Sequence, residues 1–180
     1  MFNFFKNSPP KIKTIDKVWM SKQAKWTACA GLLEANPSCL FITWFEETFT
    51  ELKEFLRLPN DQTKLILAQD ASAAKMEGRM VIFAEHYPLY RVEKELFFNL
   101  KLVEVPVLCS MDEALYQLFV GDSLIQTMKK LGIKENEFMS HNMISKSLRR
   151  VQDRVAQTVA TDIKATSQEK WLVLNNVKRR

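Results

Sequence analysis

The feature that most constrains this chain is a regular alternation of short apolar runs with helix-forming segments. The runs are rich in β-branched and aromatic residues and lie at 38–45, 63–68, 79–85 and 103–109. Between the first two runs, the apolar residues Phe49, Leu52 and Phe55 recur on one face of a helix. Continuous apolar runs are typical of strands buried on both faces. The pattern therefore predicts an α/β fold, a mostly parallel sheet in three layers with helices on both sides.

Helix signals flank this alternation at both ends. Ser21 is a candidate N-cap for a helix that ends at Asn36-Pro37, with Lys25 expected on its exposed side. From Met111 onward only helical patterns occur, and residues 140–166 read as one long helix. The tail from Lys170 is predicted to be a short strand or a docking peptide.

Three parts follow from this organisation. We expect residues 1–10 to form an N-terminal segment, residues 11–120 an α/β domain, and residues 121–180 a helical extension with a long C-terminal helix and tail. No internal repeat or low-complexity linker separates them. We expect the aromatic residues of the N-terminal segment to dock on the body of the protein or on a partner.

Composition argues against several kinds of chemistry. The 180 residues contain only four glycines and no glycine-rich phosphate-binding motif. Cys29, Cys39 and Cys109 lie in apolar contexts, which favours buried reduced thiols in a cytoplasmic protein, although a cysteine–histidine pair is possible on paper. No apolar run is long enough to span a membrane, and no metal-ligand spacing occurs. We therefore predict no cofactor, no metal and no catalytic residue.

The segment from Val105 to Val155 carries a resemblance to a known family. Its signature residues are Ser110 to Leu115, then Lys130 to Ile133, then His141, Ile144, Ser145, Lys146 and Gln152. In this order the segment resembles the end of the second motor domain of SecA, the ATPase that drives preproteins through the bacterial translocon. The resemblance implies a RecA-like, helicase C-terminal-like fold and a connection with protein transport.

The same resemblance extends upstream and then stops at the motor's catalytic loop. Glu85 matches a family glutamate, and Arg91, Val92 and Leu96 fit the pattern. Where the family carries its arginine-rich finger loop, this chain has Phe97 to Asn99. An arginine finger places positive charge on the transferring phosphoryl group, which phenylalanine cannot do. The resemblance therefore implies a degenerate, stand-alone motor domain that hydrolyses ATP only if another chain completes the site.

One candidate site lies at an edge of the predicted sheet. Glu85 and His86 follow an apolar run directly, and Arg91 comes shortly after them. Ligands of open parallel sheets bind at the carboxyl ends of strands, so these side chains could form a polar ligand site. The alternative is a loop that packs on the sheet edge with His86 in solvent.

The second candidate site is the long C-terminal helix. Ile144, Leu148, Val151 and Val155 form an apolar stripe, and the helix also carries the cations Arg149, Arg150 and Arg154. We expect part of the stripe to lack cover within the chain, so a second copy, another protein or the tail would fill it. The basic residues could instead bind nucleic acid or simply be solvated.

These observations predict a non-catalytic protein-binding or regulatory module derived from a SecA-type motor domain. Two other functions stay open at this stage. One is a nucleic-acid- or ribosome-binding protein on a helicase-type half domain, and the other is a subunit that completes an ATPase site in trans.

Overall fold

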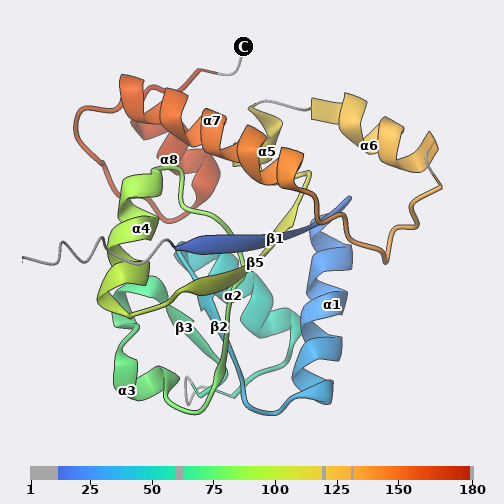
Figure 1. Cartoon of the computed structure of the whole chain (residues 1–180), viewed down its shortest axis with the longest axis vertical. Coiled ribbons are helices and arrows are strands. Elements are labelled where there is room, and N and C mark those ends of the chain that lie inside the picture. Colours follow the sequence, from blue (N-terminus) through green and yellow to red (C-terminus); the bar gives the residue numbers. More distant parts are fainter. Residues whose placement is uncertain (1–11, 60–62, 119–120, 131, 179–180) are drawn as a thin grey trace, which may run out of the picture.

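A computed structural model of the chain describes residues 12–59, 63–118, 121–130 and 132–178 (Figure 1). Its described strands form one parallel sheet in the order β1-β5-β4-β2-β3. The strands are β1 (Lys13–Trp19), β2 (Cys39–Thr43), β3 (Leu65–Leu67), β4 (Met80–Phe83) and β5 (Glu104–Ser110). The predicted α/β class with a helical C-terminal part is confirmed. The N-terminal segment 1–10 lies outside the described residues.

Helices connect the strands and then continue alone after β5. The described helices are α1 (Lys22–Ala35), α2 (Glu46–Phe55), α3 (Ala73–Met76), α4 (Tyr90–Asn99), α5 (Ala114–Gln117), α6 (Gly121–Lys130), α7 (Asn142–Thr158) and α8 (Gln168–Leu174), with a 3₁₀ turn at Ala68–Asp70. Figure 1 shows α5, α7 and α8 gathered beyond one end of the sheet. The chain thus builds its sheet first and closes it with C-terminal helices.

Strand β1 is the element that the sequence patterns failed to predict. It pairs along its whole length with β5, from Lys13 opposite Glu104 to Trp19 opposite Ser110. Its sequence mixes polar and apolar residues without a continuous apolar run and includes a buried aspartate, Asp16. As an edge strand it needs fewer apolar residues than β2, whose five residues are all buried. The polar residues of β1 therefore hid the strand from a search for apolar runs.

Helix α1 confirms one prediction and corrects another. The Ser21 hydroxyl accepts a hydrogen bond from the backbone N–H of Ala24, and the helix closes at Asn36, as predicted. Lys25, expected to be exposed, is only 1% exposed. The helix packs with this side chain turned toward the sheet, where it meets an acidic partner. Helical spacing alone could not reveal that partner, because the partner comes from a distant segment.

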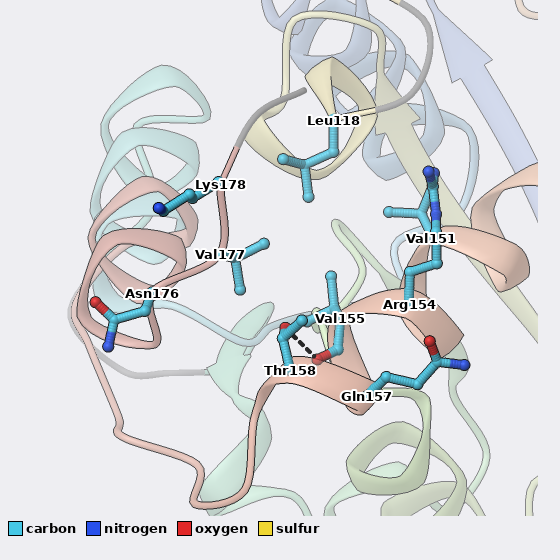
Figure 2. Close-up of a pocket in the computed structure, with 9 residues that line it drawn as sticks. All are labelled: Leu118, Val151, Arg154, Val155, Gln157, Thr158, Asn176, Val177 and Lys178. Carbon is cyan, nitrogen blue, oxygen red and sulfur yellow. Dashed lines mark hydrogen bonds between the residues drawn. The ribbon is translucent and has the colours of Figure 1, made fainter.

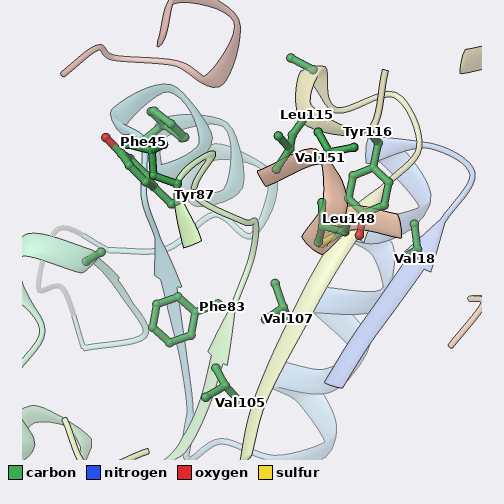
Figure 3. Close-up of a cluster of buried hydrophobic side chains, with 14 of the residues drawn as sticks. Val18, Phe45, Phe83, Tyr87, Val105, Val107, Leu115, Tyr116, Leu148 and Val151 are labelled. Atoms are coloured by element: carbon green, nitrogen blue, oxygen red, sulfur yellow. The ribbon is translucent and has the colours of Figure 1, made fainter. Parts of the chain in front are cut away.

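The two faces of the sheet are covered by different helices. Trp26 of α1 and Leu52 of α2 belong to one buried cluster, together with Phe41 and Leu108 of the sheet. The cluster on the other face joins Val18 and Val107 of the sheet to buried residues of α4, α5, α7 and α8. Figure 3 shows Leu148 and Val151 of α7 next to Leu115 and Tyr116 in this second cluster.

The C-terminal part differs in detail from its prediction. The long helix ends at Thr158 rather than near residue 166, and the tail forms the short helix α8 rather than a strand. The Ser167 hydroxyl caps α8 by accepting from the N–H of Lys170. The indole of Trp171 is fully buried, and its Nε1 donates to Asp162 at 2.7 Å. The tail therefore docks on the body of its own chain.

Candidate functional site

The carboxyl ends of the strands, called here the carboxyl edge, gather an unusual set of buried charges. Glu85 is 2% exposed and accepts hydrogen bonds from the backbone N–H groups of Trp44 and Phe45, at 2.9 and 3.0 Å, and from the Thr48 hydroxyl at 2.7 Å. Burial raises the pKa of Glu85 to about 7, although Lys25 and the Thr48 hydroxyl act in the opposite direction. Glu85 therefore holds the start of α2 instead of facing a ligand.

His86 is buried between two carboxylates. Its Nδ1 lies 2.8 Å from Glu93 Oε1, and its Nε2 lies 3.0 Å from Asp16 Oδ1. Burial alone would lower the pKa of His86, but the charges of Glu93 and Asp16 raise it well above its ordinary value. Both ring nitrogens face acceptors, so the side chain is an imidazolium that donates to each carboxylate. The expectation of a solvated His86 is wrong.

This imidazolium ties distant elements of the chain together. Glu93 of α4 also accepts from the backbone N–H of Tyr87, at 2.9 Å, and from Nε2 of Gln152 on α7, at 2.9 Å. Asp16 comes from β1. The cluster of Asp16, His86, Glu93 and Gln152 thus fixes α7 against the sheet through a buried charged centre.

A second buried pair joins α1 to the end of β5. Lys25 contacts Glu113 and donates to the carbonyl oxygen of Ala84 at 2.7 Å. Glu113 also accepts from the backbone N–H of Ser110 at 3.0 Å. Burial would lower the pKa of Lys25, but the Glu113 charge raises it. The pair is therefore charged and structural, since buried ions persist only when they are well partnered.

A cysteine–histidine nucleophile does not form at this edge. Cys109 sits beside His86, yet it is fully buried, and burial raises the pKa of its thiol to about 11 in spite of the histidine. The other cysteines, Cys29 and Cys39, are also buried and free, as predicted. A thiol with so high a pKa carries almost no thiolate at neutral pH, and thiolate is the reactive form.

The three residues predicted to form a ligand site at the carboxyl edge do not converge on one cavity. Glu85 and His86 belong to different buried networks, and Arg91 is exposed on α4. Gln168 of α8 closes the edge by donating to the His86 carbonyl at 3.1 Å and accepting from the N–H of Leu115 at 2.6 Å. The space left between Glu85, Glu113 and α8 is only about 20 Å³. This part of the edge is a sealed structural centre.

The apolar stripe of the C-terminal helix is covered within the chain. Ile144, Leu148, Val151 and Val155 are each at most 8% exposed and join the core cluster that α8 also enters. The expectation that part of the stripe lacks intramolecular cover is therefore wrong. The tail, through Trp171, supplies part of that cover. Replacing Leu148 and Val155 with serine would thus disturb core packing. A loss of partner binding by such a variant could therefore not identify an interface.

The cations of α7 divide into two groups. Arg149 is half-buried, and its guanidinium lies over the ring of Tyr90. Arg150 and Arg154 are exposed. Only the second group is available to a partner, because Arg149 is engaged by the aromatic ring and lies beside the buried charges of Glu93 and Asp16.

A groove runs beside the C-terminal half of α7, and we call it the α7 groove (Figure 2). Its volume is about 540 Å³. It is lined by Leu118, Val151, Arg154, Val155, Gln157, Thr158, Asn176, Val177 and Lys178. Leu118, Val155 and Val177 provide apolar walls, while the exposed cations Arg154 and Lys178 stand at its margin. The groove therefore combines apolar surface with positive charge.

The α7 groove includes part of the predicted partner site and residues that the sequence patterns missed. Val151, Arg154 and Val155 were predicted, whereas Leu118 and Val177 come from segments that meet α7 only in the folded chain. Val177 is placed by the turn after α8, where its N–H donates to the Leu172 carbonyl at 2.9 Å. The sequence patterns did not predict that Lys178 lies beside α7.

Two further properties concern the described residues as a set. In the part of the chain that the structure describes, no three His, Cys, Asp or Glu side chains are grouped so that they could hold a metal ion. Among the same residues, no helix combines the length and apolar character that crossing a membrane requires.

The fold and these sites define a protein with a five-stranded parallel α/β sheet and a helical C-terminal part. Comparison with known proteins finds no matching family profile. It does find similarity to protein translocase subunit SecA. The chain is 30% identical over 99 residues to SecA of Amoebophilus asiaticus, and 31% identical over 99 residues to SecA of Parabacteroides distasonis. SecA of Psychrobacter cryohalolentis is 37% identical over 46 residues.

These matches are partial on both sides. The two longer ones cover 53% of this chain but only 9% of each relative, and the shorter one covers 26% of this chain and 5% of the relative. The matched region of this chain thus spans about a tenth of the length of these two relatives. A region of about half the chain is related to SecA.

Proposed function

We propose that this chain is a non-catalytic protein-binding module derived from the second motor domain of a SecA-type protein, and that it acts in protein translocation. The observation that carries the proposal is the relationship of half the chain to protein translocase subunit SecA. The proposed partner is a protein of that machinery. The proposed contact is the α7 groove with Arg150 and Arg154 beside it.

The lack of catalysis is proposed from the sequence and from the sealed carboxyl edge. These 180 residues contain no glycine-rich phosphate-binding motif, and Phe97 to Asn99 stand where the family's arginine-rich loop is expected. In the structure, Phe97 is fully buried in the core and Phe98 is 54% exposed. Neither side chain can stabilise the charge of a transferring phosphoryl group.

The choice of the α7 groove rests on exposure and composition. It is an open hollow with apolar walls and adjacent cations, whereas His86, Glu93 and Asp16 at the carboxyl edge are committed to one another. Protein interfaces are typically built from an apolar centre with a polar and charged rim. The residues around Val177 fit that description.

Direct binding to the translocase subunits of the source organism tests the function. We expect the purified chain to bind one of them, and we expect Val177→Asp or the double change Arg154→Glu with Lys178→Glu to weaken binding at least about tenfold, as changes at interface hot spots do. Lys94→Glu, an exposed charge reversal on α4, is the matched control and should leave binding unchanged. Absence of binding to every subunit would refute the proposal, and equal binding by all variants would refute the groove.

An ATPase assay tests the proposed lack of catalysis separately. We expect no hydrolysis above a mock purification and no tight ATP binding. Turnover near 1 s⁻¹, the lower range for typical enzymes, would overturn this part of the proposal. Nucleic-acid binding is distinguished by its salt dependence, because contacts to phosphates weaken steeply between low and moderate salt. We expect binding to the protein partner to change much less over that range.

A further inference from the structure

A second pocket opens at the carboxyl edge, away from the sealed centre and from the α7 groove. Its volume is about 400 Å³. It is lined by Trp44, Phe45, Glu46, Leu67, Ala68, Gln69, Tyr87, Val92, Glu95, Leu96, Asn99, Lys164 and Ala165. They come from the carboxyl ends of β2, β3 and β4, from the start of α2, from α4 and from the segment before α8. We call it the edge pocket.

The edge pocket lies at a topological switch point of the sheet. Strands β2 and β4 are neighbours, but the helices that follow them cover opposite faces. Leu52 of α2 packs in the cluster with α1, whereas Phe97 of α4 packs in the cluster with α7. In open parallel sheets, the divergence of two such connections leaves a crevice at the carboxyl ends of the strands, and ligands bind in this crevice.

Aromatic side chains form the inner wall of the pocket. The ring of Tyr87 lies 5.2 Å from the ring of Trp44 and 5.6 Å from that of Phe45, measured between centroids. Val92 and Leu96 of α4 add aliphatic surface. Such a wall favours a flat apolar body, and the faces of aromatic rings also attract cations.

The charged side chains that line the pocket carry a net negative charge. Glu46 and Glu95 both line it and are exposed, and neither takes part in an ion pair among the described residues. Lys164 is the lining cation, but its Nζ is 2.7 Å from Asp162 and also donates to the Tyr87 hydroxyl at 3.1 Å. The positive charge of Lys164 is therefore already neutralised by an aspartate outside the lining.

The helix ends at the pocket do not oppose this preference. Asn99 is the last residue of α4, and the carbonyl oxygens of Leu96, Phe97 and Phe98 before it accept from N–H groups that follow the helix. The amino end of α2 is partly positive, but Glu85 accepts the N–H groups of Trp44 and Phe45 there. A cation in the pocket would therefore meet two exposed carboxylates, while the lining cation Lys164 is already paired with Asp162.

We propose that the edge pocket binds a small organic cation, an ammonium group carried on an aromatic body. The ring of Tyr87 is already stacked on Phe45 and covered by Lys164, so the aromatic body lies against the half-buried Trp44 and Leu96, and the ammonium group is placed near Glu46 and Glu95. A carboxylate-bearing ligand of the same shape is disfavoured because it would face these two acids. This proposal is independent of the protein partner at the α7 groove, since the two sites share no lining residue.

The test uses three ligands of nearly one shape: 2-phenylethylamine, 2-phenylethanol and phenylacetate. Protein-observed NMR titration of the full chain measures the affinity of each and shows which residues respond. We expect the amine to bind more tightly than the alcohol, the acid to bind weakest, and the shifts to centre on Trp44, Tyr87 and Leu96. Equal affinity for the three ligands, or no binding of the amine at millimolar concentration, would overturn the proposal.

Variants locate the site without disturbing the core. Glu46→Gln and Glu95→Gln should each weaken amine binding about two- to fivefold, the range for one exposed ion pair, and leave alcohol binding unchanged. Glu54→Gln, an exposed change elsewhere on α2, is the matched control. Ala165→Leu fills the half-buried pocket margin and should abolish binding of all three ligands. Thermal melting confirms that each variant is folded. Unchanged amine binding in both glutamine variants and in the filled variant would show that the amine binds elsewhere and contradict the proposal.

Discussion

The two faces of the sheet are covered in different ways. On one face, α1 and α2 follow β1 and β2 directly and pack a cluster of apolar residues such as Trp26, Phe41 and Leu52. On the other face, α4 is joined by α7 and α8, which come from the end of the chain. That second cover contains the buried charges of Asp16, His86 and Glu93, whereas on the first face α1 contributes one buried cation, Lys25, which pairs with Glu113.

The difference shows how local and remote segments achieve specific packing. A helix that directly follows its strand is placed by a short connection, so the chain itself limits where the helix can lie along the sheet. Helix α7 reaches the sheet after a long excursion, and many positions along β1 and α4 would bury its apolar stripe equally well. The hydrogen bond from Gln152 to Glu93, at 2.9 Å, can form in only one register of α7 against the sheet. We infer that the buried charges select the register of α7.

The largest expected loss of stability comes from a charge buried on a central strand, on either face of the sheet. Ile42→Asp faces the α7 side and Ile82→Asp faces the α1 side, and each residue is at most 3% exposed. An unpaired buried charge costs several kcal/mol against a total stability of about 5–15 kcal/mol. We expect insoluble or non-cooperatively melting protein in both cases. Met80→Asp, on the same strand as Ile82 but 43% exposed, should stay folded. A soluble, cooperatively melting Ile42→Asp would show that the strand is not buried.

The next effect concerns the charged centre of the α7 face. His86→Ala leaves Asp16 and Glu93 buried without their cation, so we expect a loss of about 3–5 kcal/mol in the free energy of unfolding, measured with urea. Lys13→Ala removes a cation from an exposed pair with Glu104 and should cost at most about 1 kcal/mol. If both variants lose the same small amount of unfolding free energy, the buried charged centre stabilises the fold no more than a surface ion pair does.

Alkaline pH should weaken the α7 face in particular. The folded pKa of His86 is raised above its unfolded value, so its contribution is complete below about pH 6.5 and is lost as the pH rises through the folded pKa. The raised pKa of Glu85, about 7, also lowers stability as the pH rises from its unfolded value. The difference between wild type and His86→Gln isolates the histidine. We expect this difference in unfolding free energy to shrink at alkaline pH, and a constant difference would contradict a charged His86.

The smallest effect is expected on the outer side of α7. Arg154 is exposed, so Arg154→Ala should change the unfolding free energy by no more than about 0.5 kcal/mol. Thermal melting measures this change. A loss comparable to that of a buried residue would mean that Arg154 supports the fold, and the groove variants could then no longer separate binding from stability.

The sequence predicted those parts of the fold that depend on local patterns. The run around Ile42 and the cap at Ser21 are readable because burial on both faces and helix capping leave short-range signals. Strand β1 was missed because an edge strand that carries Asp16 has no continuous apolar run. Lys25 was placed on the wrong side of α1, since its partner Glu113 lies 88 residues further along the chain.

The candidate sites were predictable only in part for a related reason. Arg154 and Val155 were singled out from the helical pattern, and both line the α7 groove. Leu118 and Val177, which complete the groove, carry no pattern of their own. The edge pocket was missed entirely, because its residues come from three strand ends, from α4 and from the segment before α8.

The sequence by itself determined the α/β class, the relationship of one region to SecA, and the segments that form most strands and helices. These properties depend on residue order and on spacing along the chain, which local physical chemistry translates directly into strands, helices and caps. Only the tertiary structure decided that His86 is a buried cation, that the stripe of α7 is covered, and where the α7 groove and the edge pocket lie. Burial and pairing are set by which distant segments meet, and a charge such as that of His86 acquires its role from neighbours that are remote in sequence.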